Sequence, residues 1–266
     1  MRAEVAFQAL RERRRALLWW GLGVVALVGL NIAFYPSVRD SAGLADYSKD
    51  LPKALRALFA GGEINLVSAT GYLNSQVFAL MAPLILLVFS IGAGATAVAG
   101  EEERGTLDLL LAQPLERADF VLQKFAALSA SVLALTLGLL VTVAVGSRLV
   151  DLEIGFGKLV AASGGVALLA LLFGALALAV GAARPGRGRA AAVAAAVAAA
   201  SWMLDGLGQA VDALDPWRPL SPYYQALGTS PLSDGVPWAS WALLVALTAL
   251  CVGAGVVGLR RRDVRQ

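Results

Sequence analysis

Histidine is absent from the 266-residue sequence, and cysteine occurs once, as Cys251. Without histidine the chain lacks the commonest general base and the commonest metal ligand, and serine–histidine chemistry is excluded. A lone cysteine in an apolar run supports neither a disulfide framework nor a cysteine metal site. The phosphate-binding pattern G-x-x-x-x-G-K-[ST] is also missing, because the nearest fragment, "GFGKLV", lacks the first glycine at the required distance.

Charge is scarce as well. Charged residues make up 15% of the chain, against about 25% in an average soluble protein. Hydrophobic residues make up 58%, and the mean hydropathy is +0.71. A soluble domain of this size needs much more polar surface, so the composition predicts an integral membrane protein that contacts the lipid bilayer. The net charge of +3 is small, and no nucleic-acid partner is expected.

Long apolar runs recur along the chain, and a spanning helix needs about 20 such residues. We expect an all-α integral membrane protein that forms a single transmembrane domain over residues 1–266. Its six predicted spans are 16–34, 77–99, 125–146, 159–183, 190–204 and 238–259. The first is expected to be an uncleaved anchor rather than a signal peptide, because no small-x-small site follows it directly.

The fifth run, residues 190–204, is short and rich in alanine. At about 1.5 Å per residue it falls short of a hydrocarbon core roughly 30 Å thick. It could be an alanine-rich cytoplasmic helix. It could also be a short span buried against other helices, since small side chains let helix backbones approach closely in lipid.

The basic residues favour six spans. With the N-terminus inside, 15 of the 22 lysines and arginines fall in cytoplasmic segments and seven fall in outer segments. Lysine and arginine are enriched on the cytoplasmic side of membrane proteins. Omitting the fifth span would place the C-terminal "RRRDVRQ" outside, against this rule. We therefore expect both termini in the cytoplasm.

On this topology the charged stretch "EEERGTLDLLLAQPLERADFVLQK", residues 101–124, is a cytoplasmic loop. Glu101–Glu103 suit the positive end of a helix, and Leu107, Leu110 and Leu111 recur at three- and four-residue spacing. Pro114 can end one helix and open the next. The pattern predicts a short amphipathic helix over 101–112 on the membrane surface. A solvated connector whose leucines rest on lipid headgroups is the alternative.

The same stretch resembles the signature loop of ABC transporter permeases of the type-two exporter family. The resemblance lies in a glutamate-rich start, Gly-Thr-Leu, further leucines, and a later proline, arginine and lysine. Two other segments, "DLPKALRALFAGG" with "GYLNSQVF" and "LSPYYQALGTSPLSDG", resemble the outer helix with the start of the second span and the loop before the last span. Leu115–Glu116 departs from the usual small or polar pair.

The resemblance implies that this loop is a coupling helix, which docks on a separate ATPase subunit over about 101–118. The residues assigned to this coupling role are Glu101, Glu102, Glu103, Arg104, Gly105, Thr106, Leu107, Leu110, Leu111, Pro114, Arg117 and Lys124. The chain itself is then no enzyme and binds no cofactor, while ATP and Mg are bound by the ATPase. The family likeness further implies a plasma (inner) membrane protein that pairs as a homodimer or a pseudo-symmetric heterodimer.

The likeness also suggests that the second and fifth spans line a substrate pathway. Asn74, Gln76, Ser201 and Trp202 are the candidate contacts, although polar residues in spans commonly serve helix packing instead. Because the predicted spans hold no charge, the expected cargo of an exporter is apolar or amphipathic. A membrane scaffold or force-transmitting subunit coupled to an ATPase is the alternative function.

The charge asymmetry predicts the result of reporter fusions. Fusions after Gly186 and after Gln266 should both report a cytoplasmic position, and a fusion near Gly228 should report an external one. An external reading for the C-terminal fusion would contradict the six-span topology, and the alanine-rich fifth run would be the first segment to re-examine.

Overall fold

The computed structural model describes residues 4–39, 68–106, 116–150, 154–228 and 231–261. In these ranges the chain forms helices and turns without strands, as predicted. Six helices are long and apolar enough to cross a membrane: Arg13–Ser37, Thr70–Ala97, Arg117–Leu149, Phe156–Ala183, Arg187–Ala210 and Trp238–Arg261. The expected all-α, six-span architecture is therefore confirmed.

The first two spans each join more than one helical element, and the third is a single helix. Helix α1 (Glu4–Ala33) continues into the short α2 (Tyr35–Arg39). The second span joins α5 (Ala69–Leu73), the π-helical η1 (Asn74–Met81) and α6 (Ala82–Ala97). Next comes α7 (Ala99–Glu103), and the third span is α9 (Arg117–Leu149).

The remaining elements form the second half. The fourth and fifth spans are α10 (Phe156–Ala183) and α11 (Arg187–Ala210). The 3₁₀-helix η2 (Asp215–Leu220), the π-helix η3 (Tyr224–Gly228) and α12 (Pro231–Asp234) precede the last span, α13 (Trp238–Arg261).

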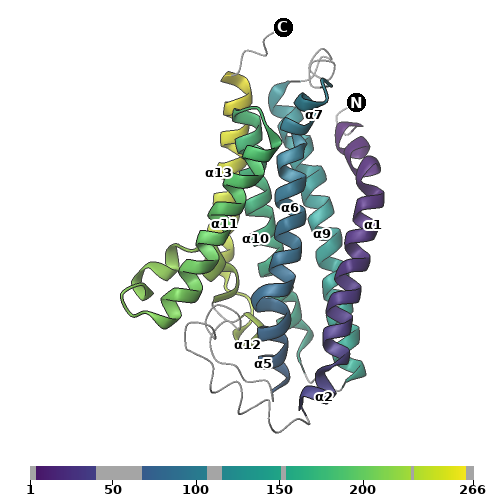
Figure 1. Ribbon diagram of the computed structural model, residues 1–266, viewed down its shortest axis with the longest axis vertical. Coiled ribbons are helices and arrows are strands. Elements are labelled where there is room, and N and C mark those ends of the chain that lie inside the picture. The colour runs from purple at the N-terminus through teal and green to yellow at the C-terminus, as the bar shows by residue number, and fades with distance from the viewer. Residues whose placement is uncertain (1–3, 40–67, 107–115, 151–153, 229–230, 262–266) are drawn as a thin grey trace.

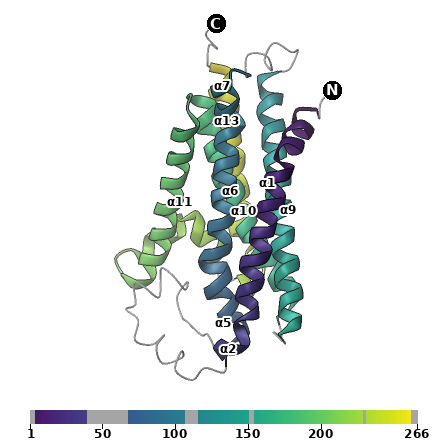
Figure 2. The same ribbon diagram turned by 45° about the vertical axis from the view of Figure 1, so that its right-hand side comes forward.

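The helices run roughly parallel to the long axis, and both termini lie with α7 at one end of the molecule (Figure 1). We call this the termini end, and the opposite end, where α2, α5 and α12 lie, the far end. Helix α11 flanks α6 and α10 at one side in both views (Figures 1 and 2). An even number of crossings places both termini on one side of a membrane.

Helix α10 is the centre of the bundle. It packs against α6, α9, α11 and α13. In its most apolar stretch 72% is buried inside the protein, against 17% for the first span. Alanine and glycine make up much of its sequence. Between helices in lipid, close van der Waals packing replaces the hydrophobic driving force, and small residues permit that packing.

The closest approach joins α6 to α10 at two glycines. A Cβ atom built on Gly94 would lie 2.1 Å from the Gly174 carbonyl oxygen. One turn away, the Ser90 hydroxyl donates a hydrogen bond to the Ala170 carbonyl. Gly94 must be glycine because a side chain there would force the two backbones apart, and a Cβ atom built on Gly174 would lie 2.2 Å from the Ser90 hydroxyl oxygen.

The fifth span differs from its predicted bounds. Helix α11 covers Arg187–Ala210 rather than 190–204, so it has 24 residues. Asp205, which the sequence placed in the following loop, lies inside this helix and is buried. Its carboxylate lies 3.1 Å from the Arg218 guanidinium, so the buried charge is paired.

The Gly94 contact generates a stability prediction. Gly94→Ala should destabilise the protein, because overpacking a tight contact costs roughly 1–3 kcal/mol and exceeds the helix-propensity gain of alanine, about 1 kcal/mol. Gly92→Ala is the matched control, since a Cβ there meets nothing within 4 Å. Thermal unfolding in detergent, followed by size-exclusion chromatography, measures both. Equal stability of the two variants would contradict the close helix contact.

Candidate functional site

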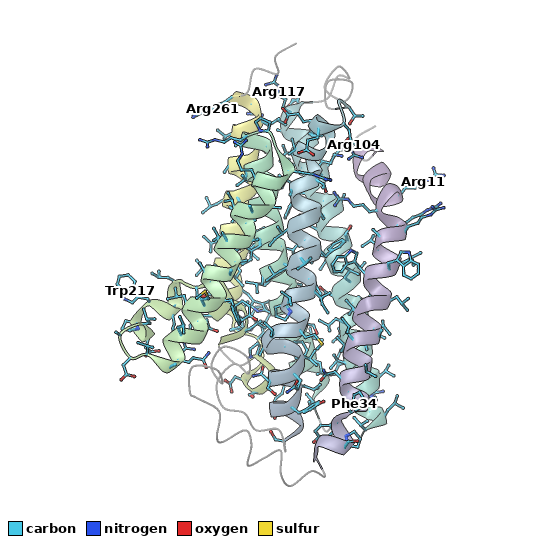
Figure 3. The ribbon with its side chains drawn as sticks, viewed as in Figure 1. Arg11, Phe34, Arg104, Arg117, Trp217 and Arg261 are labelled. Carbon is cyan, nitrogen blue, oxygen red and sulfur yellow. The ribbon has the colours of Figure 1, made fainter. Side chains whose placement is uncertain are left out.

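Charged side chains gather at the termini end, where Arg104, Arg117 and Arg261 all lie (Figure 3). At the centre is Glu101 on α7. Its carboxylate accepts a hydrogen bond from Lys124 Nζ of α9 at 2.7 Å and one from Thr106 Oγ1 at 2.6 Å. The Lys124 and Glu101 side chains are only 8% and 10% exposed. This buried pair joins the segment before residues 107–115 to the helix after them.

Further contacts satisfy the charges of this pair. Arg104 lies 3.5 Å from the Glu101 carboxylate, and Lys124 Nζ lies 5.4 Å from the centre of the Phe120 ring. Burial by itself would raise the pKa of Glu101. The hydrogen bonds from Lys124 and Thr106 and the positive charges of Lys124 and Arg104 outweigh it, so the pKa lies below its ordinary value. Glu101 is therefore ionised at neutral pH.

Two more contacts connect this cluster to the fifth and sixth spans. The Glu103 carboxylate accepts a hydrogen bond from the Arg187 backbone N–H at 2.9 Å and lies 3.2 Å from Arg187 Nε, at the start of α11. Arg117, the first residue of α9, donates to the Leu259 and Arg260 carbonyls near the end of α13, each at 3.2 Å. These contacts link α7 to α11 and α9 to α13 at the termini end.

The charged side chains of this cluster bind one another and so hold the helix ends in place. Within the described ranges no group of three or more histidine, cysteine, aspartate or glutamate side chains could hold a metal ion. The polar groups of Glu101, Lys124 and Thr106 are used in bonds to one another. The arrangement holds helix ends in fixed relation.

The structure brings six of the predicted coupling residues into two sets of contacts. Glu101, Arg104, Thr106 and Lys124 come together, while Glu103 and Arg117 reach α11 and α13. Glu102 is half-buried on α7. Leu107, Leu110, Leu111 and Pro114 lie outside the described residues, so their predicted role stays a prediction.

The predicted helix over 101–112 is confirmed at 101–103 and wrong at 104–106, and the rest of it lies outside the described residues. Helix α7 begins at Ala99 and ends at Glu103. Gly105 has a φ of 70°, in the left-handed region. Glycine adopts this conformation readily and commonly ends helices in it. The Thr106 N–H then bonds back to the Glu101 carbonyl at 3.0 Å, which closes the turn.

An apolar groove of about 360 Å³ lies between α6 and α11. Its lining includes Leu84, Leu87, Ala195, Ala198, Trp202 and Tyr223. Of the four predicted pathway residues, Trp202 lines this groove. Asn74 and Gln76 precede it on η1, and Ser201 is buried in hydrogen bonds with Ser221 and the Tyr223 N–H, each at 2.9 Å.

A second groove, of about 640 Å³, runs between α1 and α9. Its lining is apolar apart from Thr142, whose hydroxyl bonds to the Gly138 carbonyl of its own helix at 2.7 Å. The groove accordingly offers contact to hydrocarbon and no free polar partner in its lining.

Sequence reasoning missed the ion pair between Asp205 and Arg218. Arg218 also lies 3.3 Å from Asp215 and stacks 4.9 Å from the Tyr224 ring centre. The missed signal was an aspartate at the end of an apolar run, followed thirteen residues later by an isolated arginine. A buried carboxylate in a span needs a basic partner, so the nearest arginine in the following segment was the residue to consider.

Six long apolar helices, with charged clusters at their ends, define a multi-pass integral membrane protein. A family model described as "ABC-2 family transporter protein" matches residues 4–264, and the chain belongs to this family. Membership makes the chain a membrane transport component that is not itself catalytic, of the permease type, and implies a partner ABC ATPase. A search of curated proteins found no match.

The buried pair predicts a large effect of Lys124→Met. Removing one partner of a buried ion pair leaves an uncompensated charge and costs roughly 3–5 kcal/mol. Adding Glu101→Gln should recover part of the loss, since the orphaned charge is then gone. Arg104→Ala is the control, because Arg104 is 59% exposed and exposed pairs contribute at most about 1 kcal/mol.

Thermal unfolding in detergent measures all four proteins. Because the pKa of Glu101 is lowered in the folded state, the stability from this pair is present above the ordinary glutamate pKa. It is lost as the pH falls through the lowered value. A Lys124→Met protein as stable as the parent at pH 7 would contradict the buried pair.

Proposed function

We propose that this chain is the permease subunit of an ABC exporter, driven by a separate ATPase that docks on the loop of residues 101–118. The ATPase binds ATP and Mg. The chain lies in the plasma (inner) membrane with both termini and this loop in the cytoplasm. The observation that carries the proposal is the ionic cluster around Glu101, which ties both flanks of the loop to the ends of the spans.

The cluster supports coupling for a mechanical reason. Force applied to a loop reaches the spans only if the loop's flanks are held against them. Here the Glu101–Lys124 pair is buried, and Thr106 donates a further hydrogen bond to Glu101. Separating α7 from α9 would therefore leave unpaired charges in a buried site, which is costly. The two flanks therefore move together when the loop is displaced.

The α6–α11 groove supports an apolar or amphipathic substrate. Its lining side chains are aliphatic or aromatic, and the rings of Trp202 and Tyr223 add flat apolar surface that suits the apolar part of such a molecule. The groove opens at the side of the bundle, between the second and fifth spans. A second permease copy, related by a two-fold axis, would complete the pathway, since six spans of one chain present this groove on one side only.

The docking proposal is tested with Leu110→Asp combined with Leu111→Asp. If these leucines fill a groove of the ATPase, each contributes roughly 1.5–3 kcal/mol of apolar transfer, and an aspartate adds the cost of a charge in a dry site. The double variant should lose ATPase co-purification and transport, while membrane insertion stays normal because the loop lies outside the bilayer.

Glu102→Ala is the control, since a charge near a helix end contributes only about 0.3–1 kcal/mol. If the leucines merely rest on lipid headgroups, the aspartates will leave co-purification unchanged. Undiminished co-purification together with normal transport would overturn the coupling role of this loop.

A further inference from the structure

Helix α11 is held by ionic contacts at both of its ends. At the termini end, the Glu103 carboxylate of α7 engages Arg187 twice, through the backbone N–H at 2.9 Å and through Nε at 3.2 Å. Arg187 is the first residue of α11, so the carboxylate grips the helix by its backbone as well as by a side chain. A displacement of α7 therefore acts directly on the start of α11.

Near its C-terminal end, α11 is bonded to the segment that follows it. Asp205 pairs with Arg218 at 3.1 Å. The Ser221 hydroxyl donates to the Ser201 carbonyl at 2.7 Å. The chain then turns back, and the Tyr223 hydroxyl donates to the Ala79 carbonyl of η1. Pro83 lacks the N–H that would serve this carbonyl from four residues on, so the tyrosine supplies a donor to it.

Between these ends α11 presents a narrow and smooth contact face. Ala190, Ala194 and Ala198 recur every fourth residue and are buried against its neighbours. Only 33% of the apolar window of α11 is buried, against 72% for α10. The middle of α11 is therefore less enclosed by its neighbours than the middle of the central α10. Besides this packing on α10 and α6, the helix is held by ionic bonds near its two ends.

We propose that Glu103 is a positioning residue that passes the displacement of α7 to α11 through Arg187. Helix α11 then acts as a lever. Its movement shifts one wall of the α6–α11 groove and the segment Arg218–Tyr223, which is bonded to its C-terminal end. This inference rests on the proposed coupling function and deepens it, because it assigns Glu103 to a contact inside this chain rather than to the surface that meets the ATPase.

The exposure of the pair makes the test clean. The Glu103 and Arg187 side chains are 44% and 63% exposed, and an exposed pair adds little to folding stability. Changes at these positions should thus leave the bundle folded. The proposal predicts a loss of movement in α11 without a loss of protein.

The test uses the full permease–ATPase complex in lipid nanodiscs. Spin labels on Val197 of α11 and Leu133 of α9, both exposed, report the distance between these helices, with Cys251 replaced by serine in every protein. Labelled chains are diluted with unlabelled ones so that distances within one chain dominate. The variants are Glu103→Arg, Arg187→Glu and the two combined, and ATPase co-purification is measured for each.

We expect an ATP-dependent change of this distance in the parent complex. It should be lost in Glu103→Arg and reduced in Arg187→Glu. It should return in part in the combined variant, which restores the side-chain ion pair with exchanged charges but not the bond to the backbone N–H. Co-purification of the ATPase should stay unchanged in all three. Arg189→Glu is the matched control, because it alters the same charge in the same turn, and it should neither abolish the change nor rescue Glu103→Arg.

Two results would overturn the inference and leave the proposed function standing. The first is a normal distance change in Glu103→Arg. The second is reduced ATPase co-purification in Glu103→Arg that Arg187→Glu does not restore, which would make Glu103 a contact of the ATPase. A parent chain that associates with no ABC ATPase would instead overturn the proposed function, and the inference with it.

Discussion

The contact of α6 with α10 at Gly94 and Gly174 is the interaction on which the rest of the bundle depends. In hydrocarbon every backbone polar group must find its hydrogen-bond partner inside the protein. Helices then associate through packing, and packing improves as backbones approach. The two glycines bring the backbones together, and α9, α11 and α13 pack on the same central α10. Adding bulk at this crossing would move the helices that carry both the groove and the termini-end contacts.

Charge occurs where this packing ends. The buried pair of Glu101 and Lys124 and the contacts of Glu103 and Arg117 lie at the termini end. The pair of Asp205 and Arg218 lies near the loop that follows α11. A charge inside a membrane span is costly unless paired. Glu101 and Asp205, the carboxylates buried in the part of the chain that the structure describes, each have a basic partner. The apolar middle of the bundle fixes the helices, and the polar ends connect one helix to the next.

This division gives the helices different freedom. Helix α10 is enclosed by its neighbours, whereas α11 touches them along a line of small side chains and is bonded at its ends. The proposed coupling requires the permease to change shape when its ATPase does. Helix α11 lies beside the α6–α11 groove, and the buried face in the middle of this helix carries small side chains.

The sequence by itself determined the all-α class, the six spans and the position of the charged loop, because hydrocarbon thickness sets the length of a span and excludes unpaired charge. It also predicted that Glu101, Arg104, Thr106 and Lys124 belong to one functional stretch. Only the tertiary structure decided that Glu101 pairs with Lys124, that Glu103 turns to Arg187 and that Arg117 reaches α13. It also extended α11 through Asp205, whose partner Arg218 lies beyond the helix end. Periodicity and composition report what one helix presents along its own axis. Which side chain meets which, between segments as far apart as Arg117 and Leu259, depends on how the helices pack, and that is set by close contacts such as Gly94 with Gly174.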